Sequence, residues 1–394
     1  MRNLIIGYKR GWNKYECLER ALKNINQEVD VVTKDFDKIE GPYDRIFTVA
    51  ESLLPIQAKL EKKWGLNNLS ERAAEVLSDK KKMDDFCSVI GLQDLIPYSI
   101  IPTNPGDLDR YKESPFIIKP IIGSGGKAEG LNYVSFKNKK EFLLSIGTTE
   151  FFTNNVKGWK DSKFNNRINH YMVQDQLPAE AYIWGPYYYV NEKGSLRNVL
   201  WFRGKIAYGR IDKYRYETKP IEWMSINEKD VPEDVRNKSN NFFERLVTTL
   251  HLKNMFFSGP DFYKWDNDMK MIDCNPRIGQ GLQQMDDVHG NTIVSKIIND
   301  KPYSFDKQML WKISKLKPGK IKSVKDVSHL KEYWCKTNND RLRPGETILE
   351  DTHIVSERVP RISFLITGTN ESDMRKTYQT VNSKLQDCII YSTQ

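Results

Sequence analysis

Cysteine is scarce in this 394-residue sequence, which contains only five. No two of them form a CxxC pair, so the spacing typical of zinc and redox sites is missing. An odd, scattered set does not suit a disulfide framework, and reduced thiols in a cytoplasmic protein are the simplest interpretation. Only Cys274 lies inside a motif described below, and we expect its side chain to face away from the chemistry. The others are Cys17, Cys87, Cys335 and Cys388.

Long apolar runs and clustered histidines are also missing. No run of 18 apolar residues occurs, so no membrane-spanning helix is expected. The opening MRNLIIGYKRGW returns to charged residues after a short apolar run, which predicts a first strand and not a secretory signal. The five histidines are dispersed, and no Ser–His–Asp or Cys–His arrangement is visible. His289, which follows Asp286 and Asp287, is a candidate catalytic base, and a structural role is the alternative.

The formal net charge of +9 comes without an arginine-rich arm or an RNA-reading aromatic motif. Basic runs such as Lys80 to Lys82 are mixed with acidic and apolar residues. A solvated basic surface with one phosphate-binding site explains the charge better than a nucleic-acid partner does. A basic nucleic-acid binder remains an alternative, which salt-dependent DNA binding without an effect of ATP would favour.

Short runs rich in β-branched residues predict a small parallel sheet at the start of the chain. They occupy residues 3–7, 29–33 and 43–49, and a stretch with helical apolar spacing at 15–24 separates the first two. That βαβ rhythm is typical of an α/β domain.

The middle of the chain predicts hairpins and an antiparallel sheet. A strand at 116–121 runs into glycines and then into a strand at 131–136, as in a hairpin whose tip can bend over a ligand. Residues 150–168 are polar, which predicts a surface insertion. Alternation predicts strands at 171–177, 186–192, 196–203 and 205–211. Further strands are expected at 257–265, 270–277, 317–324, 332–335, 346–350 and 361–368, and helices at 70–77, 80–90, 138–146, 231–250, 291–298 and 371–385.

These elements combine α/β and α+β units, which we divide into four domains. They are an N-terminal Rossmann-like βαβ domain at 1–92, a subdomain with the glycine-rich segment at 93–178, a subdomain with an acidic hairpin at 179–305, and a small C-terminal α+β closing domain at 306–394.

The strongest chemical signal is the hairpin GPDFYKWDNDMKMIDCNPR. Residues i and i+2 share one face of a strand, so Asp273 and Asn275 point together, and the turn brings Asp261 alongside. Two carboxylates and an amide oxygen form the hard oxygen cluster that Mg²⁺ prefers. Arg277, next on that face, can hold an anion with a forked pair of hydrogen bonds. The alternative is an ordinary polar hairpin.

A second signal is FIIKPIIGSGGKAEG, where Lys119 precedes a run of glycines. Glycines let backbone N–H groups wrap phosphate oxygens without Cβ clashes. A third, weaker signal is VQDQLPAEAY, whose backbone can face an adenine edge and whose Glu180 can accept hydrogen bonds from a ribose. Arg210 and Lys213, on a strand after Lys205, are candidate partners for the γ-phosphate or the substrate, by position alone.

In this order, the segments resemble those of the ATP-grasp superfamily. The resemblance covers about residues 64–300 and is weaker on both sides. The tail, LKPGKIKSV with LRPGETI and RISFLITG, resembles the C-terminal unit of the biotin-carboxylase-like group, closest to its amino-acid and peptide ligases. The resemblance implies an ATP-grasp fold for the whole chain.

The resemblance also implies a role for each matching residue. Lys80, after Asp79, matches the first nucleotide-phosphate lysine, although Lys81 and Lys82 leave the register open. Lys119 matches the second. The lid over the phosphates matches 123–130 with Gly123, Ser124, Gly125 and Gly126; the adenine hinge matches Gln174, Asp175, Gln176 and Leu177; and the ribose acid matches Glu180.

The metal ligands of the superfamily match Asp261, Asp273 and Asn275, with Asp273 expected to bridge two Mg²⁺ ions. Arg277 matches the arginine near the transferred phosphate and the substrate carboxylate. The superfamily more often has Glu at the position of Asp273 and an acid at that of Gln174.

What the resemblance implies is a cytoplasmic ligase that uses ATP and Mg²⁺, with Mn²⁺ as a substitute, to activate a carboxylate as an acyl phosphate and transfer it to an amine. Small-molecule carboxylates and amines are the expected partners, with no nucleic acid and no membrane. An acidic carrier protein and a homodimer stay open as further partners. The alternatives are acylation of a carrier-protein thiol, carboxylation, and nucleotide binding without turnover.

Overall fold

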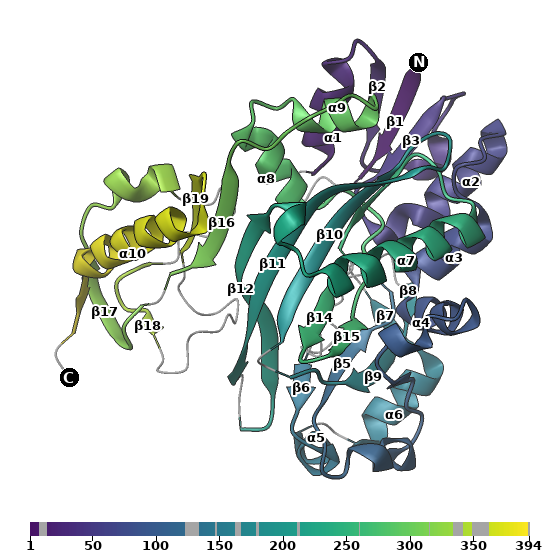
Figure 1. The fold of residues 1–394 in the computed structure, drawn as a ribbon. Helices are drawn as coiled ribbons and strands as arrows, with labels where there is room; N and C mark the ends of the chain where they lie inside the picture. Colours follow the sequence, from purple (N-terminus) through teal and green to yellow (C-terminus); the bar gives the residue numbers. More distant parts are fainter. Residues whose placement is uncertain are drawn as a thin grey trace.

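The computed structural model describes residues 1–7, 14–122, 134–145, 148–161, 167–178, 181–210, 213–259, 261–314, 316–333, 342–348 and 362–392. In Figure 1 a small C-terminal unit lies to one side of a larger body, and a long sheet joins the two. No helix among the described residues is long and apolar enough to cross a membrane.

The N-terminal part is the expected βαβ unit. Its three strands are parallel in the order β2-β1-β3, with apolar β1 at the centre. The helix expected at 70–77 is confirmed as α3, and the Ser70 side chain caps it by accepting the backbone N–H of Ala73. A helix that the sequence analysis missed, α2, follows β3. The elements are β1 (Arg2–Ile6), α1 (Lys14–Lys23), β2 (Glu28–Val32), β3 (Arg45–Thr48), η2 (Glu51–Leu53), α2 (Leu54–Trp64), α3 (Glu71–Ser78) and α4 (Lys80–Val89).

Residues 150–168 were predicted as a surface insertion, and that prediction is wrong for their first half. Helix α6 (Thr148–Lys157) buries Phe151 and Phe152 against the Phe116 and Phe142 cluster. The Asn155 amide donates to two backbone carbonyls, so a polar residue is satisfied inside the core. The neighbouring elements are β4 (Ser99–Ile100), β5 (Phe116–Pro120), β6 (Val134–Phe136), α5 (Lys139–Ser145), β7 (Trp159–Asp161), β8 (Arg167–Asn169) and β9 (Tyr171–Asp175).

The two strands expected at 196–203 and 205–211 form one 15-residue strand, β11 (Leu196–Arg210). Gly204 does not turn the chain. The indole of Trp223 lies against it, 2.8 Å from the position that a Cβ would occupy, so glycine makes room for a cross-strand ring. The flanking elements are β10 (Tyr182–Val190), β12 (Tyr216–Ile226), α7 (Glu233–Leu250), β13 (Met255–Ser258), β14 (Phe262–Trp265) and β15 (Asp268–Met271).

The C-terminal unit continues the central sheet through β16, a strand that the sequence analysis missed. β16 pairs with β12 on one side and β19 on the other. The strand expected at 332–335 is wrong where it is described, because Tyr333 ends the 3-10 helix η7 (Ser328–Tyr333). The remaining elements are α8 (Gln280–Val288), α9 (Ile293–Ile298), β16 (Gln308–Ile313), β17 (Gly319–Val324), β18 (Thr347–Ile348), β19 (Ser363–Gly368), α10 (Glu371–Cys388) and β20 (Ile389–Tyr391).

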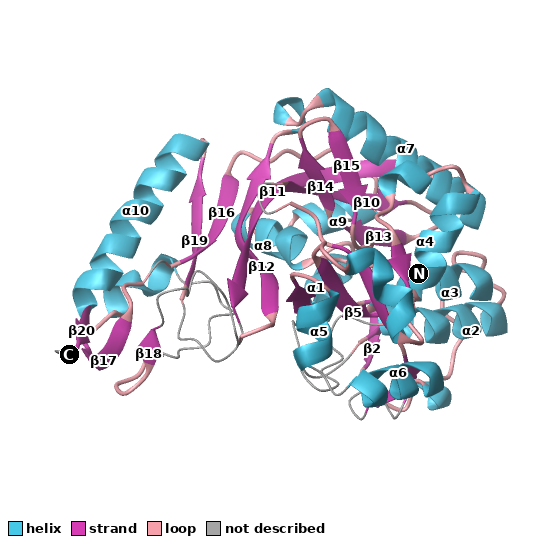
Figure 2. Ribbon diagram, turned by 90° about the horizontal axis from the view of Figure 1, so that it is seen from below, coloured by secondary structure: helices cyan, strands magenta, loops and turns pink. Residues whose placement is uncertain are grey.

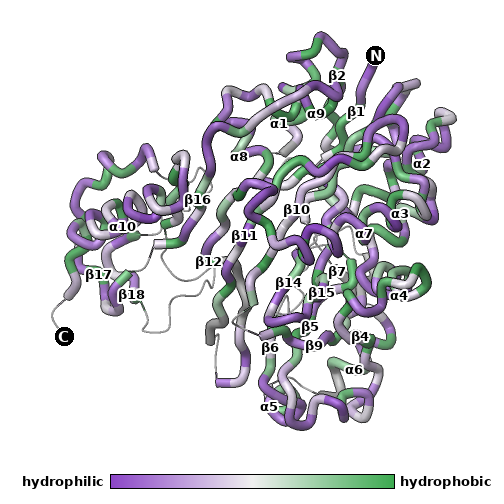
Figure 3. The backbone as a smooth tube through the Cα atoms, viewed as in Figure 1, coloured by the Kyte–Doolittle hydropathy of each residue, from purple (hydrophilic) through white to green (hydrophobic). Residues whose placement is uncertain are grey.

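One long sheet organises the molecule, in the order β15-β14-β10-β11-β12-β6-β5-β9-β4. One hydrophobic cluster packs α7 and α10 against one face of its central strands, and a second packs α1, α8 and α9 against the other. Figure 2 shows the strands between α10 and the helices α2, α3, α4 and α7. Hydrophobic segments follow the strands and the covered sides of the helices, while loops are mostly hydrophilic (Figure 3). The sheet curves so that β15 and β5, near opposite ends of this order, approach each other.

Candidate active site

The acidic hairpin brings the three predicted metal ligands to one place. Asp261 directly precedes β14, and Asp273 follows β15 by two residues. Beyond the two strands the backbones still pair, with Asp261 N donating to Asp273 O at 3.1 Å and Ser258 N donating to Asn275 O at 2.9 Å. Asp273 and Asn275 therefore lie in an extended segment that continues β15, and the predicted alternation holds there.

The charges at this hairpin favour a cation. Burial, and then the charge of Asp273, raise the pKa of Asp261 to about 7, although the Arg277 guanidinium opposes the shift. Two close carboxylates without a cation between them are costly, and a divalent ion relieves that cost. Among the described residues, no three His, Cys, Asp or Glu side chains form a metal-holding group. If two carboxylates and an amide bind a Mg²⁺ ion, phosphate and water can occupy its remaining coordination positions.

Lys80 is the lysine of the KKK run that faces this hairpin. It begins α4, whose N-terminus Asp79 caps by accepting the backbone N–H of Lys82. The Nζ atom of Lys80 lies 3.6 Å from Oδ1 of Asp273. Lys81 and Lys82 instead pair with Asp85 and Glu75 along the helix surface. Of the three lysines, Lys80 is therefore the one that lies beside the acidic hairpin.

Lys119, on β5, has no exposed surface. Its Nζ donates to the carbonyl oxygen of Ile272 at 2.7 Å, next to Asp273. Burial lowers the pKa of Lys119, and the carboxylates of Asp273 and Asp84 offset only part of that shift. The curved sheet thus delivers a second lysine to the acidic hairpin from the far end of its strand order.

Arg277 pairs with a residue that the sequence analysis did not single out. Its Nε donates to Glu51, the first residue of η2, and its Nη2 lies 3.3 Å from Oδ1 of Asn275. Glu51 lies three residues after the end of the parallel strand β3. Ligands of parallel sheets bind beyond the carboxyl ends of the strands. An acidic residue just after β3 could therefore have been predicted from the sequence as a candidate site residue.

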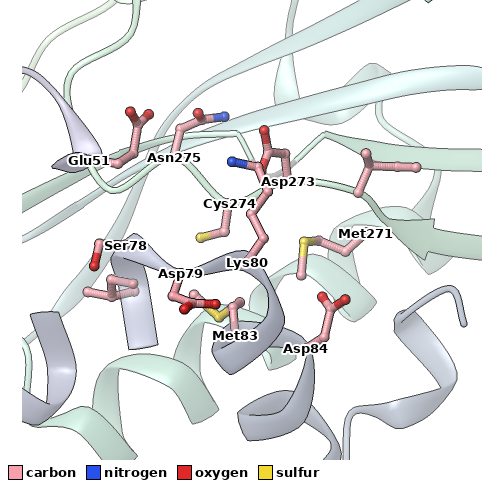
Figure 4. A pocket seen from close by; sticks show the side chains of 12 residues that line it. Glu51, Ser78, Asp79, Lys80, Met83, Asp84, Met271, Asp273, Cys274 and Asn275 are labelled. Atoms are coloured by element: carbon pink, nitrogen blue, oxygen red, sulfur yellow. The ribbon is translucent and has the colours of Figure 1, made fainter. Parts of the chain in front are cut away.

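Four of the residues described above, Glu51, Lys80, Asp273 and Asn275, line one cavity. In Figure 4 Lys80 and Asp273 lie together, and Glu51 lies beside Asn275. Cys274 lines the same cavity, because alternation along this segment turns its side chain toward α3 and α4. The expectation that it faces away from the site is therefore wrong. Burial raises its pKa, so it is a neutral thiol. The lining residues are Glu51, Leu77, Ser78, Asp79, Lys80, Met83, Asp84, Met271, Ile272, Asp273, Cys274 and Asn275.

The predicted adenine hinge follows β9. Gln174 is fully buried, and neither its Oε1 nor its Nε2 has a hydrogen-bond partner among the described residues. Leu177 is buried with Ile183, while Asp175 accepts hydrogen bonds from Arg110 and Tyr111. The backbone N–H of Gln176 reaches the carbonyl oxygen of Pro115 at 3.5 Å. The predicted ribose acid Glu180 lies outside the described residues, as do Gly123, Ser124, Gly125 and Gly126 of the predicted lid.

Of three weaker predictions, two fall elsewhere, and the structure does not test the third. Lys213 is exposed, and its Nζ lies 5.1 Å from the ring centroid of Tyr214, so it does not line the cavity. Arg210 ends β11, and its side chain lies outside what the structure describes. His289 is structural: its ring contacts the carbonyl oxygen of Met285 at 2.9 Å and packs edge-on against Phe305.

Similar solved structures cover the whole chain. The L-amino acid ligase from Bacillus licheniformis superposes with a TM-score of 0.65 at 14% identity, over 100% of this chain and 99% of that one. The chain has the ATP-grasp fold. The N5-carboxyaminoimidazole synthetase from Staphylococcus aureus, complexed with ADP, gives 0.60 at 10% identity over 97% of each chain. Phosphoribosylglycinamide synthetase from Anaerococcus prevotii gives 0.56 at 15% identity over 99% of each. No protein-family model and no curated protein matches the sequence significantly.

The described residues of the chain fit ATP and Mg²⁺. A fully buried amide with two unpartnered atoms, Gln174, suits an edge that donates and accepts hydrogen bonds, as a nucleobase does. Asp261 and Asp273 suit a divalent cation, and the cations of Lys80 and Lys119 beside them suit phosphate oxygens.

Proposed function

We propose that this protein is an ATP-dependent ligase that joins a carboxylate to an amine through an acyl phosphate. One observation carries the proposal. Lys80, Asp273 and Asn275 line one cavity. Asp261, Lys119 and Arg277 contact residues of that lining, so three separate parts of the chain bring two carboxylates, an amide, two lysines and an arginine together. Its structural neighbours, which include an L-amino acid ligase and a phosphoribosylglycinamide synthetase, support the reaction class.

The chemistry needs two displacements. A substrate carboxylate oxygen attacks the γ-phosphorus of ATP, the bond from that phosphorus to the bridging oxygen of ADP breaks, and an acyl phosphate forms. The nitrogen of an amine then attacks the acyl carbon, phosphate leaves with the bonding electrons, and the nitrogen loses a proton. The products are an amide, ADP and phosphate. The first displacement spreads negative charge over the transferred phosphoryl group.

Each residue has a part in this scheme. Lys80 and Lys119 place positive charge beside the phosphates before the reaction starts, so little reorganisation is needed as charge moves. Arg277 holds the attacking carboxylate in place. Asp261, Asp273 and Asn275 would hold Mg²⁺, which supplies neutralisation of phosphate charge. Gln174 and the residues after it would hold the adenine.

The test is ADP release from ATP and Mg²⁺ with a panel of amino acids and small carboxylates, each with and without an amine. We expect ADP only when a carboxylate is present, and hydroxylamine should trap the activated acyl group as a hydroxamate. ADP release that needs bicarbonate, a thiol or a carrier protein instead would move the protein to another ATP-grasp reaction. Tight ATP binding with no turnover under any condition would contradict the ligase proposal.

A further inference from the structure

Arg277 and Glu51 form an ion pair at the wall of the cavity. The pair joins two distant parts of the chain, because Glu51 follows β3 of the N-terminal domain while Arg277 follows the acidic hairpin. Only 15% of the Arg277 side chain and 12% of the Glu51 side chain are exposed. The guanidinium also lies within 3.5 Å of Asn275 Oδ1 and Ser258 Oγ. The pair therefore borders the predicted metal ligands directly.

This ion pair is charged in spite of its burial. The guanidinium Nε of Arg277 donates directly to the Glu51 carboxylate, so each buried charge has an opposite charge in contact with it. Apolar residues of similar size often fill such a buried position at no cost in stability, so stability alone is a poor reason for the pair. Its place, next to where a carboxylate must meet the γ-phosphate, points to a ligand.

We propose that Glu51 and Arg277 together bind the acyl donor as a zwitterionic α-amino acid, with the donor's carboxylate on Arg277 and its ammonium group on Glu51. This inference rests on the proposed function and names the donor's chemical class. The two protein groups carry the opposite charges to the two ends of the ligand. Their direct contact in the free protein is the contact that the ligand opens and replaces.

Charge balance explains why a zwitterion suits the pair better than a simple carboxylate. A zwitterion that separates Arg277 from Glu51 gives each group a new partner, so no buried charge is left alone. A carboxylate without an ammonium group takes Arg277, leaves Glu51 without that partner and places a second anion near it. Binding of the simple carboxylate therefore carries a penalty that the amino acid avoids.

The same arrangement decides which nitrogen reacts. An ammonium group held by Glu51 keeps its proton and has no lone pair, so the donor's own nitrogen does not attack an acyl phosphate. The attacking amine must come from the second substrate. Glu51 is in this sense a specificity residue, and it takes no part in bond making.

The experiment compares each amino acid with the carboxylate that lacks its amino group: alanine with propionate, leucine with 4-methylpentanoate, and phenylalanine with 3-phenylpropionate. ADP release is measured with one fixed amine. For the pair with the better-used amino acid, we expect the wild-type kcat/KM to favour the amino acid by about tenfold or more. In Glu51→Gln this preference should vanish, through a higher KM for the amino acid and a lower KM for the simple carboxylate, which no longer meets a second anion.

Glu71→Gln is the matched control, because Glu71 is an exposed carboxylate in the same domain that pairs with Lys62 on the surface. Its kinetics should equal those of the wild type. Glu51→Asp keeps the charge but withdraws it by one methylene, and it should raise KM for the amino acid only. This second variant keeps the test decisive if Glu51→Gln unfolds.

Two results overturn the inference and leave the ligase proposal standing. One is equal use of the amino acid and its partner by the wild type. The other is an equal loss with both substrates in Glu51→Gln or Glu51→Asp, which would mean that Glu51 only positions Arg277. A wild-type protein that releases no ADP with any carboxylate would instead overturn the proposed function itself.

Discussion

The Nζ atom of Lys80 lies 3.6 Å from Oδ1 of Asp273, although 193 residues of sequence separate the two. Lys80 begins a helix, and its backbone N–H donates to Ile121 O at 2.9 Å, at the end of the strand that carries Lys119. Asp273 extends the acidic hairpin. This contact therefore ties the helix, the strand with the buried lysine and the candidate metal site into one unit.

The three consecutive lysines allow an internally controlled prediction. Lys80→Ala should lower kcat for ADP release by about 10²-fold or more, because it removes a positive charge placed beside the phosphates. Lys81→Ala and Lys82→Ala remove lysines that pair with Asp85 and Glu75 on the helix surface, and each should stay within about twofold of the wild type. Steady-state kinetics of all three variants checks the assignment. A larger loss in Lys81→Ala or Lys82→Ala would contradict it.

Asp273→Asn should abolish ADP formation, because a neutral amide replaces one of the two carboxylates at the candidate metal site. The fold should remain, since the change keeps the size of the side chain. Asp268→Asn, in the turn of the same hairpin, is the matched control and should keep full activity. Thermal unfolding confirms folding in both variants. ADP release at the wild-type rate in Asp273→Asn would remove Asp273 from the metal site.

Gln174→Leu separates stability from nucleotide binding. Without nucleotide, the variant should be about 1 kcal/mol more stable, because the buried amide of Gln174 has no partner among the described residues. With saturating ATP, the gain in unfolding temperature should shrink, and the KM for ATP should rise about tenfold. Denaturant unfolding with and without ATP measures both effects. An unchanged KM for ATP would place the adenine elsewhere.

The C-terminal unit is held to the sheet by Glu222, a buried carboxylate on β12 that pairs with Arg375 and Lys312. Burial disfavours the charged form, but hydrogen bonds from these two cations outweigh it and lower the pKa of Glu222 from 4.5 to about 2. The stabilisation is therefore complete above about pH 4.5 and is lost as the pH falls through 2. Glu222→Gln should cost about 2 kcal/mol at pH 7 and much less near pH 2.5.

Urea unfolding at several pH values measures this dependence. Glu228→Gln, at an exposed position close in sequence, is the control and should follow the wild type at every pH. A constant difference between Glu222→Gln and the wild type across the acid range would contradict the ionic origin of the effect.

Gly279→Ala should damage the site without touching a charged residue. A Cβ on Gly279 would lie 2.3 Å from the Cβ of Ser258 and 2.6 Å from the Tyr187 ring, so the backbone two residues after Arg277 must move. We expect a loss of about 1–3 kcal/mol in stability together with a clear loss of kcat. Gly290→Ala has open space but a positive φ of 70°. It should cost about 1 kcal/mol and leave kcat unchanged, which separates stability from activity.

Local patterns predicted those parts of the fold in which one strand or helix expresses its own periodicity. The three strands around β1, the cap at Ser70 and the long helices α7 and α10 follow directly from alternation, helical spacing and capping chemistry. The wrong predictions concern segments whose structure depends on contacts with residues far away in the sequence. In the sequence, Gly204 indicates a break between two strands, but in the structure the Trp223 ring packs against it within one strand. The α6 segment is polar in sequence, but its Phe151 packs into the cluster of Phe116 and Phe142.

Some contacts of the candidate site could likewise be predicted from local sequence, and others could not. Asp261, Asp273 and Asn275 could be grouped from one hairpin, because the turn and the two-residue repeat act within 15 residues of sequence. Glu51 could not be grouped with Arg277, because their contact depends on the N-terminal domain docking beside the acidic hairpin.

The sequence alone determined the types of chemistry available to this protein: an oxygen cluster for a cation, lysines for phosphates and an arginine for an anion. The tertiary structure decided which of the three lysines lies beside Asp273, that Lys119 arrives from the far end of the sheet, and that Glu51 pairs with Arg277. The reason is physical. Residue type and short-range spacing determine charge and local direction, whereas the curvature of the sheet and the docking of domains determine distances between segments.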